Sequence, residues 1–194
     1  TGVLTAASAW VQEPNGLAFS PDESLLYVSD TSAALRTDGS GHHHIAVFDV
    51  AADNSLHNPR VFAEVSPGLS DGFRVDTQGW VYTSSEDSVQ VYHPDGTLLG
   101  KIPVPEKVGN LCFGGPQGNQ LFIAASTSLY RITLHTQGNS TPMSKEILLL
   151  VEKCSHCFSY YDIDSGSRLH RVQLPDFPHE FVVDAAQRYA YIGH

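Results

Sequence analysis

The sequence predicts an all-β fold that is built from repeated antiparallel hairpins. One pattern recurs along the chain: a strand, a polar turn, and a second strand. Its clearest copies begin at Asn15 and Asp71, and further copies begin at Gly109 and His179. Asp71 and Gly109 lie 38 residues apart, close to the roughly 40-residue blade of a four-stranded propeller sheet. We therefore predict a partial β-propeller, with insertions or junctions in the two longer intervals.

Each copy supplies a hairpin, and further strand-like runs follow it. The hairpins are expected over residues 15–30, 71–85, 109–125 and 179–193. The added runs, rich in β-branched and aromatic residues, are 45–50, 60–65, 88–92, 98–104 and 128–133. Two short strands after a hairpin would give up to four strands per blade.

Composition agrees with a globular all-β chain. The 194 residues can bury a core, and their apolar runs are short, far from the roughly 20 residues of a membrane span, so we predict no membrane association. The formal net charge of −10 argues against a nucleic-acid partner and favours cation binding, although solubility alone would also explain it. Three cysteines favour a reducing, cytoplasmic compartment over a disulfide framework. The chain starts at Thr1 without a methionine or a secretory signal, and we expect that it was cut or started late.

An ordered set of segments carries a family resemblance. The segments are 14–22, 27–30, 45–50, 70–76 with 79–82, and 109–115 with 121–123. On these segments, residues 2–134 closely resemble the gluconolactonase, senescence marker protein and luciferin-regenerating enzyme family of six-bladed propellers. The resemblance covers the later half of such a fold, about three blades of six.

What the resemblance implies is a metal-dependent lactone hydrolase acting on a sugar lactone or a related lactone. Asn15 matches the family's asparagine metal ligand, and Asp71 matches its aspartate ligand. The implied cation is divalent, with Ca²⁺ favoured and Zn²⁺, Mg²⁺ or Mn²⁺ as alternatives. It would polarise the lactone carbonyl for attack by water, and Asp71, the only anion of the pair, is the candidate catalytic base. The family's glutamate ligand and its substrate-binding arginine and asparagine belong to earlier blades, so we expect this chain to be an incomplete, inactive fragment.

Other interpretations of these residues stay open. Asn and Asp before Gly are common turn residues, because their side chains bond to their own backbone; taken without the resemblance, Asn15 and Asp71 are more often turn residues than ligands. Gly109 has no side chain to offer, and Asn110, one place later, would point differently, so we leave it outside the ligand set. The alternative function is a non-catalytic β-propeller that serves as a binding or scaffold module.

Two further motifs contain metal-binding residue types. His42, His43 and His44 follow a Gly- and Ser-rich loop, and the alternating directions of strand side chains would separate them, so we interpret them as loop histidines. Cys154 and Cys157 have the spacing of a zinc knuckle or redox pair, but no second pair follows at finger spacing, and the residues after them read as a strand. We interpret these thiols as structural or incidental.

A polar, turn-prone seam divides the sequence. We predict a propeller domain over residues 1–135, a linker or fusion seam over 136–145, and a propeller-like blade over 146–194. Residues 143–194 resemble the start of a YVTN-repeat or amine-dehydrogenase-like propeller, and our hypothesis is that two proteins are joined here. The alternative is an irregular fourth blade of the same propeller. In either case the open sheet edges would favour self-association.

Overall fold

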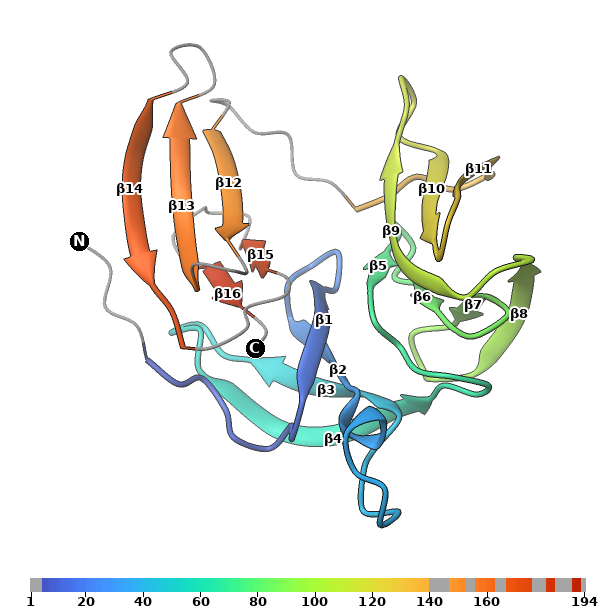
Figure 1. Ribbon diagram of the computed structural model, residues 1–194, viewed down its shortest axis with the longest axis horizontal. Helices are drawn as coiled ribbons and strands as arrows, with labels where there is room; N and C mark the ends of the chain where they lie inside the picture. The colour runs from blue at the N-terminus through green and yellow to red at the C-terminus, as the bar shows by residue number, and fades with distance from the viewer. Residues whose placement is uncertain are drawn as a thin grey trace. The chain divides into compact units, whose positions relative to one another are not determined.

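The computed structural model describes residues 5–139, 147–152, 156–162, 167–175, 181–183 and 190–192. The chain divides into two compact units, Thr1–Asn139 and Ser140–His194. Both are built from small antiparallel sheets (Figure 1). No helix in the described ranges is long and apolar enough to cross a membrane.

The first blade contains four consecutive antiparallel strands. These are β1 (Pro14–Phe19), β2 (Leu25–Asp30), β3 (His44–Val50) and β4 (Leu56–Glu64), which lie in the sheet in that order. The turn from β1 to β2 forms around Asp22, whose Oδ1 accepts hydrogen bonds from the Ser20 hydroxyl at 2.7 Å and the Ser24 amide at 3.1 Å. A polar turn after a short apolar strand therefore produces the predicted hairpin.

The second and third blades repeat this arrangement. The second consists of β5 (Phe73–Val75), β6 (Val81–Ser84), β7 (Ser88–Tyr92) and β8 (Leu98–Pro103). The third has three described strands, β9 (Val108–Gly114), β10 (Gln120–Ala125) and β11 (Leu129–Thr133). In the second blade Asp76 organises the turn, because its Oδ1 accepts hydrogen bonds from the backbone amides of Gln78 at 2.8 Å and Trp80 at 2.9 Å.

The core lies between the faces of neighbouring blades. One cluster joins residues of the first and second blades, including Ile45, Val47 and Phe73. Another cluster joins the second and third blades and includes Val89 and Leu121. A blade in this position is buried on both faces, so its strands read as continuous apolar runs. The stacking also brings β5 into contact with both β1 and β9. The opening strand of each blade thus lies beside the opening strand of the next, as in a propeller.

The second unit has a three-stranded sheet and a two-stranded sheet. The first comprises β12 (Ile147–Glu152), β13 (Cys157–Asp162) and β14 (Arg168–Gln173), and the second comprises β15 (Phe181–Val183) and β16 (Ala190–Ile192). Cys157 is buried in β13, and its thiol donates a hydrogen bond to Gln173 Oε1 at 3.3 Å. Cys154 and His179 lie outside the described residues.

Most of the predicted runs in the first unit form strands, and the largest boundary difference is at β4. The sequence predicts this strand over 60–65, whereas β4 begins at Leu56 and includes Pro59. Proline lacks an amide donor and is tolerated at a sheet edge, and β4 is the edge strand of the first blade. Its register also shifts twice against β3.

The described start of the predicted linker is attached to the first unit. The Asn139 amide donates to the Val75 carbonyl, and the Gly138 amide donates to the Gly118 carbonyl, each at 3.0 Å. Gly138 also forms an isolated antiparallel bridge with Asp76. The polar, turn-prone composition predicted a linker here. Backbone hydrogen bonds attach its start to the blades, and such bonds do not depend on apolar side chains. The hypothesis that two proteins are joined at the seam stays a prediction.

Candidate metal centre

Asn15 and Asp71 occupy corresponding places in the first two blades. Asn15 lies at the start of β1, where the pairing with β2 shifts register, and Asp71 lies two residues before β5 begins. Because β1 and β5 are neighbours, the two side chains meet: Asn15 Nδ2 donates a hydrogen bond to Asp71 Oδ1 at 3.2 Å. Both residues are half-buried. The structure therefore brings together the two residues that the sequence predicted as ligands.

The glycine after each of these residues allows the opening strands to approach closely. A Cβ atom on Gly16 would overlap the Asp71 carbonyl oxygen, and one on Gly72 would overlap the Asn110 side chain. The Gly72 amide also donates to the Gly109 carbonyl at 2.9 Å. The recurring glycine is thus explained by the close approach of neighbouring blades, which leaves no room for a Cβ atom.

Two buried serines fix the backbone around the pair. Ser29 Oγ accepts a hydrogen bond from the Gly16 amide at 2.8 Å and lies 3.3 Å from the Asp71 carbonyl oxygen, to which it can donate. Ser84 Oγ accepts a hydrogen bond from the Asp71 amide at 2.8 Å. Both serines have 0% exposure. The sequence analysis missed them, although each stands two residues after a tyrosine in the second strand of its hairpin, and that repetition was a usable signal.

The third blade presents a different arrangement. Gly109 has no side chain at the corresponding place, and Asn110 Oδ1 accepts a hydrogen bond from the Leu111 amide at 2.8 Å. The Asn110 side chain lies against Gly72. This side chain therefore takes part in the local backbone and in the contact between blades.

The donor groups of Asn15 and Asp71 suit a hard divalent cation. Ca²⁺ takes carboxylate and amide oxygens, and the two side chains already converge to 3.2 Å from adjacent blades. The orientation of an Asn side-chain amide is assigned from its hydrogen bonds, so rotating it would turn the Asn15 oxygen toward the same point. The pair fits as part of a coordination shell, and further ligands must come from water or other residues.

The histidine run differs from the sequence interpretation. His44 is not a loop residue: it is the first residue of β3 and is buried. The expected alternation holds for His43, whose Nδ1 lies 3.1 Å from the Val65 carbonyl oxygen. It does not separate His42 from His44, because residues two apart share a side of an extended chain, and their rings stack with centroids 4.8 Å apart.

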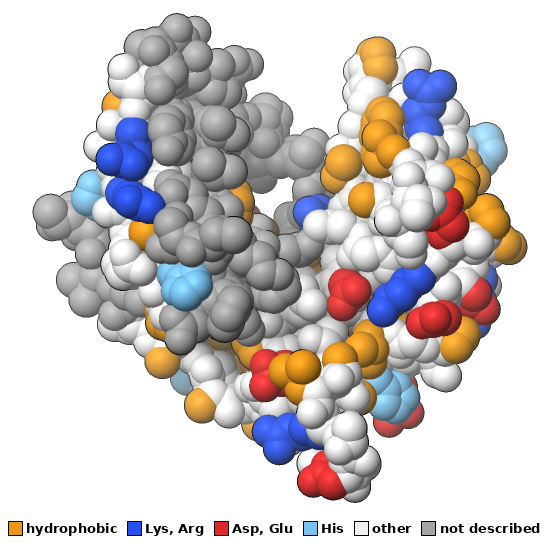
Figure 2. All heavy atoms as spheres, in the orientation of Figure 1, with side chains coloured by type: hydrophobic (Ala, Val, Ile, Leu, Met, Phe, Trp, Pro, Cys, Tyr) orange, Lys and Arg blue, Asp and Glu red, His pale blue; other side chains and the backbone are white. Residues whose placement is uncertain are grey.

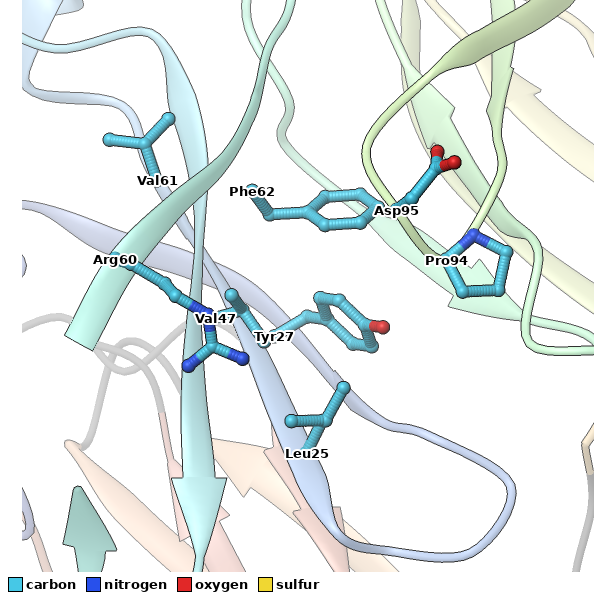
Figure 3. A pocket seen from close by; sticks show the side chains of 8 residues that line it. All are labelled: Leu25, Tyr27, Val47, Arg60, Val61, Phe62, Pro94 and Asp95. Atoms are coloured by element: carbon cyan, nitrogen blue, oxygen red, sulfur yellow. The ribbon is translucent and has the colours of Figure 1, made fainter. Parts of the chain in front are cut away.

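A shallow pocket lies away from these residues, between the first two blades (Figure 3). Its lining comes from β2, β3, β4 and the turn between β7 and β8, and consists of Leu25, Tyr27, Val47, Arg60, Val61, Phe62, Pro94 and Asp95. Leu25 begins β2, whereas Asp30, which pairs with Pro14 beside Asn15, ends it. None of the predicted site residues lines this pocket. Figure 2 shows acidic and basic side chains scattered over one face rather than gathered into a single patch.

Residues 3–127 match the family model for the SMP-30/gluconolactonase/LRE-like region. The chain belongs to this family. It is 34% identical over 148 residues to a gluconolactonase of Zymomonas mobilis. The alignment covers 71% of this chain and 39% of that protein. It is 32% identical over 128 residues to the pentonolactonase XacC of Haloferax volcanii, covering 64% of this chain and 42% of that protein.

Solved structures of the same family share the fold. The gluconolactonase XC5397 of Xanthomonas campestris superposes with a TM-score of 0.55 and 44% identity, covering 63% of this chain and 38% of that chain. A luciferin-regenerating enzyme superposes with the same TM-score at 24% identity, covering 66% of this chain and 47% of its own. This chain therefore spans about two fifths of the length of the Zymomonas and Haloferax relatives, and the matched family region contains Asn15 and Asp71.

Proposed function

We propose that the first unit supplies part of the active site of a metal-dependent lactone hydrolase. The observation that carries this proposal is the 3.2 Å contact between Asn15 and Asp71, which joins the opening strands of two adjacent blades. Membership of a family that includes gluconolactonases supports lactone hydrolysis as the class of reaction.

The pair would hold a divalent cation, with Ca²⁺ favoured because both donors are hard oxygen ligands. Zn²⁺, Mg²⁺ and Mn²⁺ are alternatives that a metal-replacement assay separates. The bound cation would polarise the lactone carbonyl and stabilise the negative charge that develops on its oxygen. Asn15 contributes a neutral donor, so Asp71 supplies the only negative charge of the pair.

Asp71 is the candidate general base. Its backbone is held on both sides, by Ser84 at the amide and by Ser29 at the carbonyl. A base held in this way can accept a proton from water without first reorganising, which is the condition for efficient proton transfer. In this structure Asn15 Nδ2 donates a hydrogen bond to Asp71 Oδ1; with the cation bound, the Asn15 amide oxygen would turn toward the ion instead.

A sugar lactone is the proposed substrate class. The Zymomonas relative is named a gluconolactonase and the Haloferax relative a pentonolactonase, so lactones of six- and five-carbon sugar acids are the compounds to test first. Because the chain spans about two fifths of these relatives, we propose that other blades supply the remaining ligands and the substrate contacts. Two protein ligands hold Ca²⁺ weakly, and we expect the 194-residue chain alone to be inactive.

The test is lactone hydrolysis by the complete protein and by the Asp71→Asn variant. We expect Asp71→Asn to lower kcat/KM by about 100-fold or more, the range for loss of a general base, and to lower the content of bound cation. Asp53→Asn is the matched control, because Asp53 is a turn carboxylate bonded to Ser55 in the first blade.

Two outcomes contradict the proposal in different ways. If Asp71→Asn leaves hydrolysis and metal content unchanged, the site assignment is wrong. If the complete protein hydrolyses no lactone with any of the four cations, the non-catalytic binding module replaces the enzyme.

A further inference from the structure

A second group of ligand-type side chains lies within the first blade. Asp30 ends β2, His44 begins β3, and these two residues are direct partners across the strands. His42 precedes His44 by two residues and shares its side of the chain. Each of the three residues offers a ligand atom, and these atoms lie within 4.8 Å of one another.

Asp30 is a buried carboxylate that is already held in place. Its side chain has 0% exposure. Oδ2 accepts a hydrogen bond from the Gln12 amide at 2.9 Å and lies 3.1 Å from His42 Nδ1, and Oδ1 accepts one from the Ser32 amide at 3.0 Å. Burial raises the pKa of Asp30, but these donors outweigh it and bring the pKa to about 2. The group therefore presents a fixed negative charge at neutral pH.

His44 provides an independent observation that points to a ligand. The residue is 7% exposed, and across the described part of the chain its Nε2 is the buried side-chain nitrogen or oxygen that has no hydrogen-bond partner. Native structures rarely leave such an atom unsatisfied, and an unplaced ion is one of the ordinary explanations. A neutral imidazole nitrogen of this kind has the lone pair that binds metals.

We propose that Asp30, His42 and His44 form a binding site for a transition-metal ion of the Zn²⁺ type, separate from the Asn15 and Asp71 pair. Two imidazoles and one carboxylate are a donor set that suits Zn²⁺, whereas Ca²⁺ takes oxygen ligands. Zinc bonds of 2.0–2.2 Å in tetrahedral geometry separate neighbouring ligand atoms by roughly 3.3 Å. The 3.1 Å between Asp30 Oδ2 and His42 Nδ1 already matches this spacing.

Such a site would connect the loop of the first blade to its strands. The ion would tie His42 and the first residue of β3 to the end of β2, and so close the segment over 31–43 at its base. Asp30 also accepts hydrogen bonds from the amides of Gln12 and Glu13, which lead into β1. The site would therefore support the backbone that carries Asn15, and we assign it a structural role.

Cobalt(II) titration of the untagged 194-residue protein tests the site. An affinity tag of histidines would bind the same metals, so it must be absent. We expect one Co²⁺ ion per chain with the visible absorption of a tetrahedral N,O site, displaced by one equivalent of Zn²⁺. Excess Ca²⁺ should not displace it. Absence of this absorption, or displacement by Ca²⁺, would overturn the proposal.

The histidines supply matched variants. His42→Asn and His44→Asn should each weaken Co²⁺ binding at least about tenfold, the loss that outer-shell changes alone produce. His43→Asn, between them, should bind normally, because His43 faces Val65 instead. His42 has a side chain that is 40% exposed, so its variant keeps the test decisive if the buried His44 variant does not fold. Unchanged binding in His42→Asn, or equal loss in His43→Asn, would contradict the site.

The Asp71→Asn variant separates this inference from the proposed lactonase function. It should keep full Co²⁺ binding at the histidine site. Loss of the Co²⁺ absorption in Asp71→Asn would show that cobalt binds at the Asn15 and Asp71 pair instead and would overturn the second site.

Discussion

Two groups of potential ligands in the first unit differ in what the fold must do to assemble them. The Asn15 and Asp71 pair is half-buried, contains only oxygen donors for a cation, and forms where two blades meet. Asp30, His42 and His44 lie within one blade, with two of the three residues buried and nitrogen donors included. The first group therefore depends on blade stacking, whereas the second depends on strand pairing and on the loop that leads into β3 within one blade. Donor type and burial then direct the two groups toward different cations.

Removing one type of metal at a time should give the largest difference between the two groups, because one metal is expected to affect hydrolysis and the other thermal stability. A Ca²⁺-selective chelator should lower lactone hydrolysis by the complete protein by about 100-fold or more, since the reaction loses its electrophile. A Zn²⁺-selective chelator should leave most of the hydrolysis and lower thermal stability instead. Initial rates and thermal unfolding, each measured with both chelators, check this. Equal loss of activity with both chelators would mean that one shared site serves both purposes.

Zinc should stabilise the first unit through the histidine group. At a free concentration of 100 times Kd, a ligand that binds only the folded state adds about 2.7 kcal/mol to the free energy of unfolding. This gain should disappear in His42→Asn and persist in His43→Asn. Denaturant titration of the three proteins with and without Zn²⁺ measures it, and a zinc effect of the same size in His42→Asn would argue against the group.

Gly16→Ala should damage the contact between blades. The added Cβ would overlap the Asp71 carbonyl oxygen, and such overpacking typically costs about 1–3 kcal/mol. The variant should also lose affinity for the hard cation while keeping the histidine site. Gly100→Ala is the control, because a Cβ there meets nothing within 4 Å. Equal unfolding free energies for the two variants would show that the close approach of β1 and Asp71 is unimportant.

Ser84→Ala should have the smallest effect of this series. It removes the hydrogen bond to the Asp71 amide, and the net loss of one such hydrogen bond costs about 0.5–1.5 kcal/mol. Ser55→Ala, in an exposed turn, should change the free energy of unfolding by less than about 0.5 kcal/mol. We expect Ser84→Ala to reduce cation affinity by misplacing Asp71. Normal affinity in a folded Ser84→Ala protein would exclude a positioning role for this serine.

The sequence predicted the strands better than the connections. Short apolar runs such as residues 45–48 in β3 were recognisable because both faces of a blade are buried. The β4 boundary was missed because Pro59 reads as a strand breaker, and only the position of β4 at the sheet edge makes it acceptable. The attachment of Gly138 and Asn139 to the third and second blades uses backbone groups alone, which leave no pattern in the side chains.

The candidate sites also divide into residues that the sequence could predict and contacts that it could not. Asn15 and Asp71 were predicted as ligands from the family resemblance, and each opens a copy of the repeated pattern, so the two residues meet when the blades stack. His42 and His44 were set aside because the alternation along a strand separates neighbours, although that alternation aligns residues two apart. Their partner, Asp30, lies 12 residues before His42 in the chain, and no local pattern links them.

The sequence by itself determined the repeated hairpins and the family, because periodicity and short motifs are written along the chain, and it predicted Asn15 and Asp71 as ligands. Only the tertiary structure explains why glycine follows each of these residues, and only it shows which serines hold Asp71 and which histidines face Asp30. These are contacts between residues that the chain keeps apart and that the stacking of blades and the pairing of strands bring together. Their distances depend on register and close approach, which composition does not specify.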